Sequence, residues 1–262
     1  MTDTLRFEVK DRIGTITLNR PEKLNAFTAD MLTAWVAALE ECRASDGVHV
    51  VVLTGAGRGF CTGGDVGGMG EAADPSPLET KTRLWDQIER VPKTLQTLDK
   101  PVIAAVNGVA TGAGMDMALM CDLRFAAESA RFAETYVRMG LVPGAGGAYF
   151  LPRLVGPAKA LELFWSGEFV DAREAERLGL VNRVFPDADL MPKTYEFAER
   201  VASGPPLSIR LIKRLLYQSL RTDLVTSLDL VSSHMTIVRA SDDHKEAVRA
   251  FKEKRPAKFE GR

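Results

Sequence analysis

Apolar and polar side chains alternate over the first part of the chain. The polar pair Asp11-Arg12 separates two alternating stretches, which predicts a β-hairpin. Two mostly apolar runs further along are typical of strands that are buried on both faces. The strands that we expect are residues 7–9, 13–18, 48–53, 101–106, 123–126 and 131–133.

Apolar positions with helical spacing occur early in the chain and dominate after residue 156. Thr28 can cap the first helix, which ends at Gly47, and Pro92 is expected to break or kink a later one. Residues 71–80 are polar, contain two prolines and are interpreted as a mobile loop. The other helices that we expect are residues 84–98 (with that break), 158–165, 172–178, 190–202, 207–220, 224–240 and 243–254.

Two passages of the chain resemble each other. Residues 48–65 read VHVVVLTGAGRGFCTGGD, and residues 100–116 read KPVIAAVNGVATGAGMD. Each is an apolar strand, a turn, a run of small residues and then an acid. This weak repetition suggests one supersecondary unit stacked on a copy of itself, with residues 123–133 beginning a third turn.

Length, charge and composition limit the possible functions. The 262 residues are enough for one large domain, or for a core with a smaller appendage. Lys plus Arg is 34 and Asp plus Glu is 35, and the net charge of −1 gives no electrostatic case for nucleic acid. The three cysteines contain no C-x-x-C pair and the three histidines no H-E-x-x-H, so neither a disulfide framework nor a metal site is expected. With no apolar stretch long enough for a signal or a membrane span, we expect a cytoplasmic protein without a membrane partner.

The two glycine-rich loops that follow apolar runs do not match phosphate-binding motifs. Neither has G-x-G-x-x-G or G-x-x-x-x-G-K-[ST], and no G-x-S-x-G occurs. The glycines of either loop alone can be read as tight turns. As a pair, the loops place small residues where a strand passes into a helix, and the first turn of a helix has free N–H groups. Two such N–H groups that converge on one oxygen would form an oxyanion hole.

The motifs around these loops resemble those of the crotonase (enoyl-CoA hydratase/isomerase) superfamily, in order over nearly the whole chain. Phe60-Cys61-Thr62-Gly63-Gly64-Asp65 resembles the F-x-x-G-x-D loop of the family. The other matching segments are residues 19–26 (NRPEKLNA), 107–114 (NGVATGAG), 141–147 (LVPGAGG) and 251–255 (FKEKR).

This resemblance implies an α/β fold, a crotonase-like spiral of β-β-α turns with a C-terminal helical trimerisation region. The spiral core would cover residues 1–200 and the helical region residues 201–262. Such chains assemble as a homotrimer or a dimer of trimers.

The resemblance also implies an acyl-CoA substrate, whose thioester oxygen would accept hydrogen bonds from the N–H groups of Gly64 and Ala113. Coenzyme A is part of that substrate, and no separate cofactor is implied. The basic C-terminal cluster is either a solvated tail or a phosphate-binding group, from this chain or a neighbouring one. The residues implied to contact CoA are Lys23, Ala26, Thr62, Gly63, Gly64, Asp65, Val66, Lys254 and Arg255.

The first acid–base candidate is Asp116. It lies three residues after Ala113, so that both would share one face of a helix that starts at Gly112. The family usually has Glu here, and the shorter Asp needs a water to reach the substrate. Alternatively, Asp116 only complements the helix dipole.

The second family glutamate is replaced by Tyr136, a poor base at pH 7 but a hydrogen-bond donor. Glu134 would face the same side if that stretch is extended, and would then supply the missing carboxylate. A solvated or ion-paired Glu134 is the alternative. Gly144 stands where some relatives have an Asp, which disfavours dehalogenase chemistry and isomerases that depend on that Asp.

The favoured function is an enoyl-CoA hydratase that acts on a 2-enoyl-CoA thioester through an enolate. Double-bond isomerisation is the alternative, because it needs only one base. A member that binds acyl-CoA without catalysis stays open, since fold does not fix function.

Overall fold

The computed structural model describes residues 3–65, 67 and 76–262 and contains two sheets. The larger sheet has the strand order β1-β2-β3-β5-β7-β10, and the smaller has the order β4-β6-β8-β9. The larger sheet consists of β1 (Leu5–Lys10), β2 (Ile13–Leu18), β3 (Val50–Gly55), β5 (Val102–Val106), β7 (Leu123–Ala127) and β10 (Arg183–Phe185). The smaller consists of β4 (Gly59–Cys61), β6 (Val109–Thr111), β8 (Arg131–Ala133) and β9 (Val170–Asp171).

The chain winds as a spiral that supplies one strand to each sheet per turn. The pairs β3 and β4, β5 and β6, and β7 and β8 are consecutive in sequence, and each pair divides between the two sheets. Within each sheet these strands are parallel neighbours. The repetition seen in the sequence is therefore a repetition of structure, and the expected spiral of β-β-α turns is confirmed.

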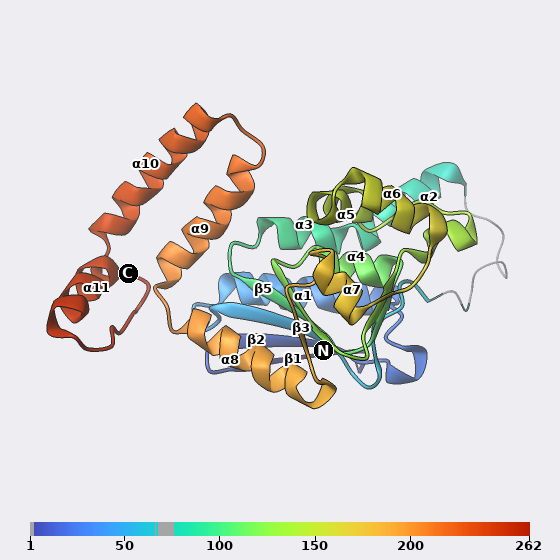
Figure 1. The fold of residues 1–262 in the computed structure, drawn as a ribbon, viewed down its shortest axis with the longest axis horizontal. Coiled ribbons are helices and arrows are strands. Elements are labelled where there is room, and N and C mark those ends of the chain that lie inside the picture. The colour runs from blue at the N-terminus through green and yellow to red at the C-terminus, as the bar shows by residue number, and fades with distance from the viewer. Residues whose placement is uncertain (1–2, 66, 68–75) are drawn as a thin grey trace.

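Both faces of the larger sheet are covered, which explains its uninterrupted apolar strands. Val50 and Val52 pack with α8 residues such as Ala198 in one core cluster. Val51 and Leu53 point the opposite way, into the cluster that includes residues of α1. Figure 1 shows α8 on one side of the sheet and α1, α3 and α4 on the other.

Eleven α-helices lie in the described residues, and α8 and α10 have the expected bounds. Thr28 caps α1 through a hydrogen bond from the Met31 N–H, as expected. The eleven described helices are α1 (Ala29–Ala44), α2 (Pro77–Arg83), α3 (Arg90–Thr97), α4 (Ala113–Leu119), α5 (Gly147–Val155), α6 (Pro157–Ser166), α7 (Ala172–Arg177), α8 (Leu190–Ala202), α9 (Pro206–Ser219), α10 (Leu224–Ala240) and α11 (Asp242–Glu253).

The structure corrects the expected loop at residues 71–80. Residues 71–75 lie outside the described part, but α2 begins at Pro77. Ser76 caps it reciprocally with Glu79, and Pro77 occupies the first helical position. The sequence contains the helix-start pattern S-P-x-E, but the polarity of the stretch favoured its interpretation as a loop. A π-helical turn at Leu84–Ile88 then joins α2 to α3, so the expected break falls a few residues before Pro92.

Helices α10 and α11 stand away from the two sheets, and α9 leads to them from the core (Figure 1). Helix α10 has no buried residue, although it carries large apolar side chains such as Leu228 and Ile237. When large apolar side chains gather on an exposed surface, that surface commonly marks an interaction site. Among the described helices, none is both long and apolar enough to span a lipid bilayer.

Candidate active site

Three neighbouring parallel strands of the smaller sheet end at the same edge. Residues 62–65 follow β4, Gly112 and Ala113 follow β6, and Glu134 follows β8. Ligands of α/β proteins bind at the carboxyl ends of parallel strands. This edge therefore brings both glycine loops and one candidate acid together.

The first loop is held by pairing with Phe27. The Phe27 N–H donates to the Gly63 carbonyl at 2.8 Å, and the Asp65 N–H donates to the Phe27 carbonyl at 3.0 Å. This parallel bridge uses the neighbours of Gly64 and leaves the N–H of Gly64 on the opposite side. Within the described part of the chain, that N–H has no hydrogen-bond acceptor.

The second loop requires glycine on both sides of Ala113. Gly112 has φ of +50°, and its N–H donates to the Ala133 carbonyl at 2.9 Å. A Cβ at position 114 would lie 2.1 Å from the Cys61 carbonyl oxygen, so only glycine lets the loops approach so closely. Ala113 is the first residue of α4, and among the described residues no group accepts its N–H.

The two loops are in direct contact. A Cβ placed on Gly63 would lie 3.5 Å from the Ala113 nitrogen. Gly64 and Ala113 are each only partly buried, so a ligand can reach them. Two free N–H groups of adjacent loops thus lie at one accessible place.

Asp116 is fully buried at the third residue after Ala113. Its Oδ2 accepts a 2.6 Å hydrogen bond from the Tyr136 hydroxyl and a 3.2 Å bond from the Ala145 N–H. Its Oδ1 has no partner among the described residues. Gly147 packs against this carboxyl so closely that a Cβ there would lie 2.1 Å from Oδ1.

Glu134 is also buried, with 1% of its surface exposed, and neither carboxyl oxygen has a hydrogen-bond partner in the described structure. It lies close to Asp116, and a proton on Glu134 can be shared with the Asp116 carboxylate as a hydrogen bond. An isolated buried carboxylate is costly, so a carboxyl without donors is held in its neutral form.

The pKa values of the two acids are shifted by different sets of neighbours. Burial raises the pKa of Glu134 to about 10, and the charge of Asp116 adds to the shift. Burial also raises the pKa of Asp116, but the Tyr136 hydroxyl and the backbone N–H groups oppose this shift by stabilising its charge. Burial, with the charge of Asp116, raises the pKa of Tyr136 and keeps its proton in place. Because the donors surround Asp116 and none reaches Glu134 in the described structure, the arrangement favours the proton on Glu134.

The condition under which Glu134 was expected to face the side of Tyr136, an extended stretch, is not met. Thr135–Met139 forms a 3₁₀ helix, with Glu134 just before it. Both side chains nevertheless approach Asp116, because Glu134 follows β8 directly and Tyr136 lies in the first turn of that helix. The alternative of a solvated Glu134 does not hold either, since it is buried.

Several residues expected to contact CoA have structural partners. Asp65 accepts from the Arg20 guanidinium at 2.8 Å, and the same guanidinium donates to the Ala26 carbonyl at 2.6 Å. The Ala26 N–H donates to the Lys23 carbonyl. Thr62 donates to the carbonyls of the Lys23-Leu24 segment at 3.4 to 3.5 Å. Lys23 is exposed at the rim, and Val66 lies outside the described residues.

Lys254 and Arg255 are not beside this site in a single chain, because they follow α11 (Figure 1). Arg255 makes two hydrogen bonds to Glu246, at 2.5 and 2.9 Å, and one to Glu253 at 2.6 Å. Lys254 is exposed.

Asn25, Arg20 and Gly147 also shape the site, although the sequence motifs alone give them no role in it. The buried Asn25 amide donates to the carbonyls of Ala56 and Gly59 and so fixes the chain ahead of β4. All three residues lie in segments that match the family, but a motif alone does not tell which side chain holds a loop.

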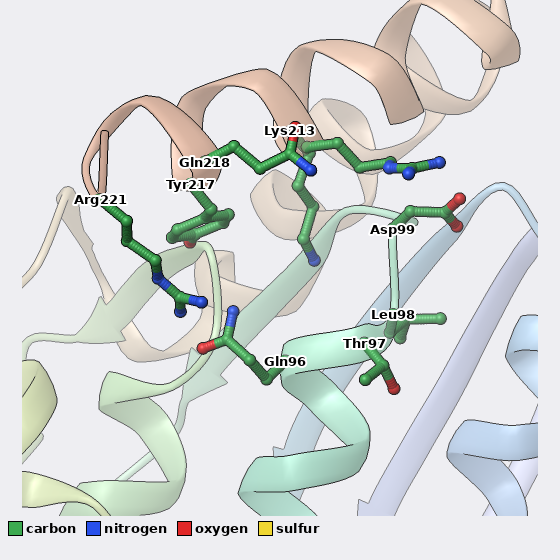
Figure 2. Close-up of a pocket in the computed structure, with 9 residues that line it drawn as sticks. Gln96, Thr97, Leu98, Asp99, Lys213, Tyr217, Gln218 and Arg221 are labelled. Atoms are coloured by element: carbon green, nitrogen blue, oxygen red, sulfur yellow. The ribbon is translucent and has the colours of Figure 1, made fainter. Parts of the chain in front are cut away.

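A separate polar cavity of about 310 Å³ lies between the end of α3 and α9 (Figure 2). Lys213 pairs with Asp122 at 2.7 Å, and Tyr217 donates to the same carboxylate at 2.8 Å. Arg210 pairs with Asp99 at 2.8 Å. These contacts fix α9 to the core, far along the chain from the glycine loops.

The spiral of β-β-α turns, with two glycine loops beside a buried acid, is the architecture of crotonase-type enzymes. The family model described as Enoyl-CoA hydratase/isomerase matches residues 8–262. The chain belongs to the enoyl-CoA hydratase/isomerase family.

Individual relatives cover the whole chain. A Rhodobacter capsulatus protein named "Probable enoyl-CoA hydratase" is 39% identical over 259 residues, which are 99% of this chain and 98% of that protein. The 1,2-epoxyphenylacetyl-CoA isomerase of Escherichia coli is 35% identical over 267 residues, the full length of both. The crystal structure of an enoyl-CoA hydratase from Bacillus anthracis superposes with a TM-score of 0.92 at 34% identity, covering 99% of this chain and all of that one.

Proposed function

We propose that the chain is an enoyl-CoA hydratase that adds water to a 2-enoyl-CoA thioester. The observation that carries this proposal is the pair of unused N–H groups, of Gly64 and Ala113, in contacting loops beside Asp116. The thioester oxygen accepts both N–H groups, and one such donor lowers the barrier by about 3 kcal/mol.

Asp116 acts as the base. Tyr136 and the Ala145 N–H stabilise its charge, while Glu134 carries a proton and so does not compete for that charge. Because Asp116 is buried and short, it reaches the substrate through a bound water, which is the water to be added.

The proposed step balances with these two carboxyls. Asp116 takes a proton from water as the water oxygen bonds to the β carbon, and the C=C electron pair moves to the thioester oxygen. The enolate then takes the Glu134 proton at its α carbon. The proton on Asp116 returns to Glu134, which lies next to it, and both acids recover their starting forms.

Double-bond isomerisation is the second candidate, and one observation favours it. If Glu134 keeps its proton throughout, Asp116 is the single available base, and one base suffices to move a proton between the α and γ carbons.

The test is a direct comparison of hydration of 2-enoyl-CoA, from crotonyl-CoA to longer chains, with isomerisation of 3-enoyl-CoA. Hydration above background, lost by orders of magnitude in Asp116→Asn with CoA affinity kept, is the expected result. Isomerisation without hydration selects the second candidate. Binding of acyl-CoA without either turnover identifies a non-catalytic member.

The assembly is part of the proposal. We infer a homotrimer or a dimer of trimers formed through residues 201–262, supported by the exposed apolar side chains of α9 and α10. Lys254 and Arg255 would then reach CoA phosphates from a neighbouring subunit.

A cytoplasmic location is also part of the proposal. It is supported by the three cysteines, which are buried and unpaired, as is usual in a reducing compartment.

A further inference from the structure

An apolar cavity lies directly beyond Tyr136. It has a volume of about 530 Å³, and α5, α6 and the 3₁₀ helix at Thr135–Met139 contribute to its lining. Of its described lining residues, all except Tyr136 are apolar, and none is charged. Its volume lies within the range of small-molecule sites.

The side chains around this cavity are unusually exposed for their type. Val142 is 79% exposed and Trp165 is 72% exposed. Leu161 lies one helical turn before Trp165 on the same face of α6, and is 44% exposed. A contiguous apolar surface of this kind on a soluble protein is normally covered by a ligand or a partner.

Tyr136 identifies the occupant. It is at once part of the cavity wall and the hydrogen-bond donor to Asp116. Its ring also lies beside the second glycine loop and the turn at Gly144, because a Cβ on Gly112 or on Gly144 would be 3.9 Å from it. A substrate whose reacting carbons lie at Asp116 therefore has its remaining acyl group next to this ring and this cavity.

We propose that this cavity binds the distal part of the acyl group, and that the preferred substrates are 2-enoyl-CoA thioesters with an uncharged apolar chain or ring beyond the crotonyl length. This inference rests on the proposed function, since it takes the reacting carbons to lie at Asp116. A crotonyl group leaves the cavity empty, and an acyl group with a terminal carboxylate places a charge against apolar walls.

The first test measures the affinity of saturated acyl-CoAs, which cannot be hydrated, by calorimetry. Affinity should rise from acetyl-CoA to octanoyl-CoA by up to about fourfold for each methylene that enters the cavity. Leu161→Arg should abolish this gain. Val9→Arg, at a comparably exposed apolar residue on strand β1 (47%), is the control and should keep it.

The second test uses Trp165 as a reporter of the cavity. In the Trp85→Phe variant the remaining tryptophans are the buried Trp35 and the exposed Trp165. Octanoyl-CoA should shift the emission of Trp165 to shorter wavelength, while acetyl-CoA should not.

An affinity independent of chain length would overturn the inference. So would Leu161→Arg changing the oligomer mass in light scattering while the chain-length dependence persists, because the cavity would then be a subunit contact. Failure of the proposed function is a separate result: chain-length-dependent binding lost in Leu161→Arg, with no turnover of any enoyl-CoA, supports the cavity assignment and rejects the hydratase.

Discussion

The hydroxyl of Tyr136 donates a 2.6 Å hydrogen bond to Oδ2 of Asp116. The tyrosine hydroxyl thus stabilises the charged form of Asp116 and opposes the effect of burial on its pKa. A hydrogen bond to a charged group contributes about 1.5–3 kcal/mol, which corresponds to about one to two units of pKa. In the proposed mechanism, Asp116 depends on Tyr136 for its ability to act as a base near neutral pH.

Tyr136→Phe removes this donor and should raise the pKa of Asp116. The acid limb of the pH profile of kcat/KM should move up by about one to two pH units. Tyr149→Phe is the control, because Tyr149 is exposed and its hydroxyl accepts a bond only from Arg221 among the described residues. An acid limb that does not move in Tyr136→Phe would show that Asp116 is not the titrating base.

Gly147→Ala should displace the Asp116 carboxyl, since the added Cβ would lie 2.1 Å from Oδ1. A displacement of about 1 Å in a catalytic group costs roughly a hundredfold in rate. Gly144→Ala, in the same turn, has no neighbour closer than 3.8 Å to the new Cβ and serves as the control. Equal kcat values in the two variants, with circular dichroism showing both folded, would contradict the assigned position of Asp116.

Six strands and the two glycine loops could be predicted from the sequence, because alternating or apolar runs and clustered glycines are local patterns. Strands β4, β6, β9 and β10 were missed, since each is three residues or shorter and is formed by pairing with a distant strand. The burial of Glu134 could not be predicted, because it depends on the packing of elements far apart in the chain. Local polarity suggested a surface side chain instead.

Arg20→Lys should weaken the hold on the first loop while keeping the positive charge. The Arg20 guanidinium bonds the Ala26 carbonyl and the Asp65 carboxylate together, and a lysine cannot reproduce this forked geometry. The N–H of Gly67 and the side chain of Arg20 lower the pKa of Asp65, so the carboxylate stays charged in the variant at neutral pH.

We expect kcat/KM of Arg20→Lys to fall by about ten- to a hundredfold, because the Gly64 N–H loses its fixed position. Arg6→Lys, on strand β1 at the exposed hairpin, is the control and should leave kcat/KM unchanged. An unchanged kcat/KM in Arg20→Lys would mean that the bridge to Phe27 alone positions the loop.

Glu134→Gln tests which acid carries the proton, through stability rather than activity. The pKa of Glu134 rises from its ordinary value of 4.5 to about 10 in the folded protein. Between these values the folded protein holds a proton that the unfolded chain releases, so the wild type loses stability as pH rises. The neutral glutamine does not titrate and escapes this loss.

The stability of Glu134→Gln relative to the wild type should therefore increase from pH 5.5 to pH 9, by at most about 1.4 kcal/mol per pH unit. Chemical denaturation at several pH values measures this difference. Glu128→Gln, at an exposed glutamate that pairs with Arg173, is the control and should show only a small difference in stability. A difference between Glu134→Gln and wild type that stays constant with pH would mean that Glu134 is ionised in the folded protein.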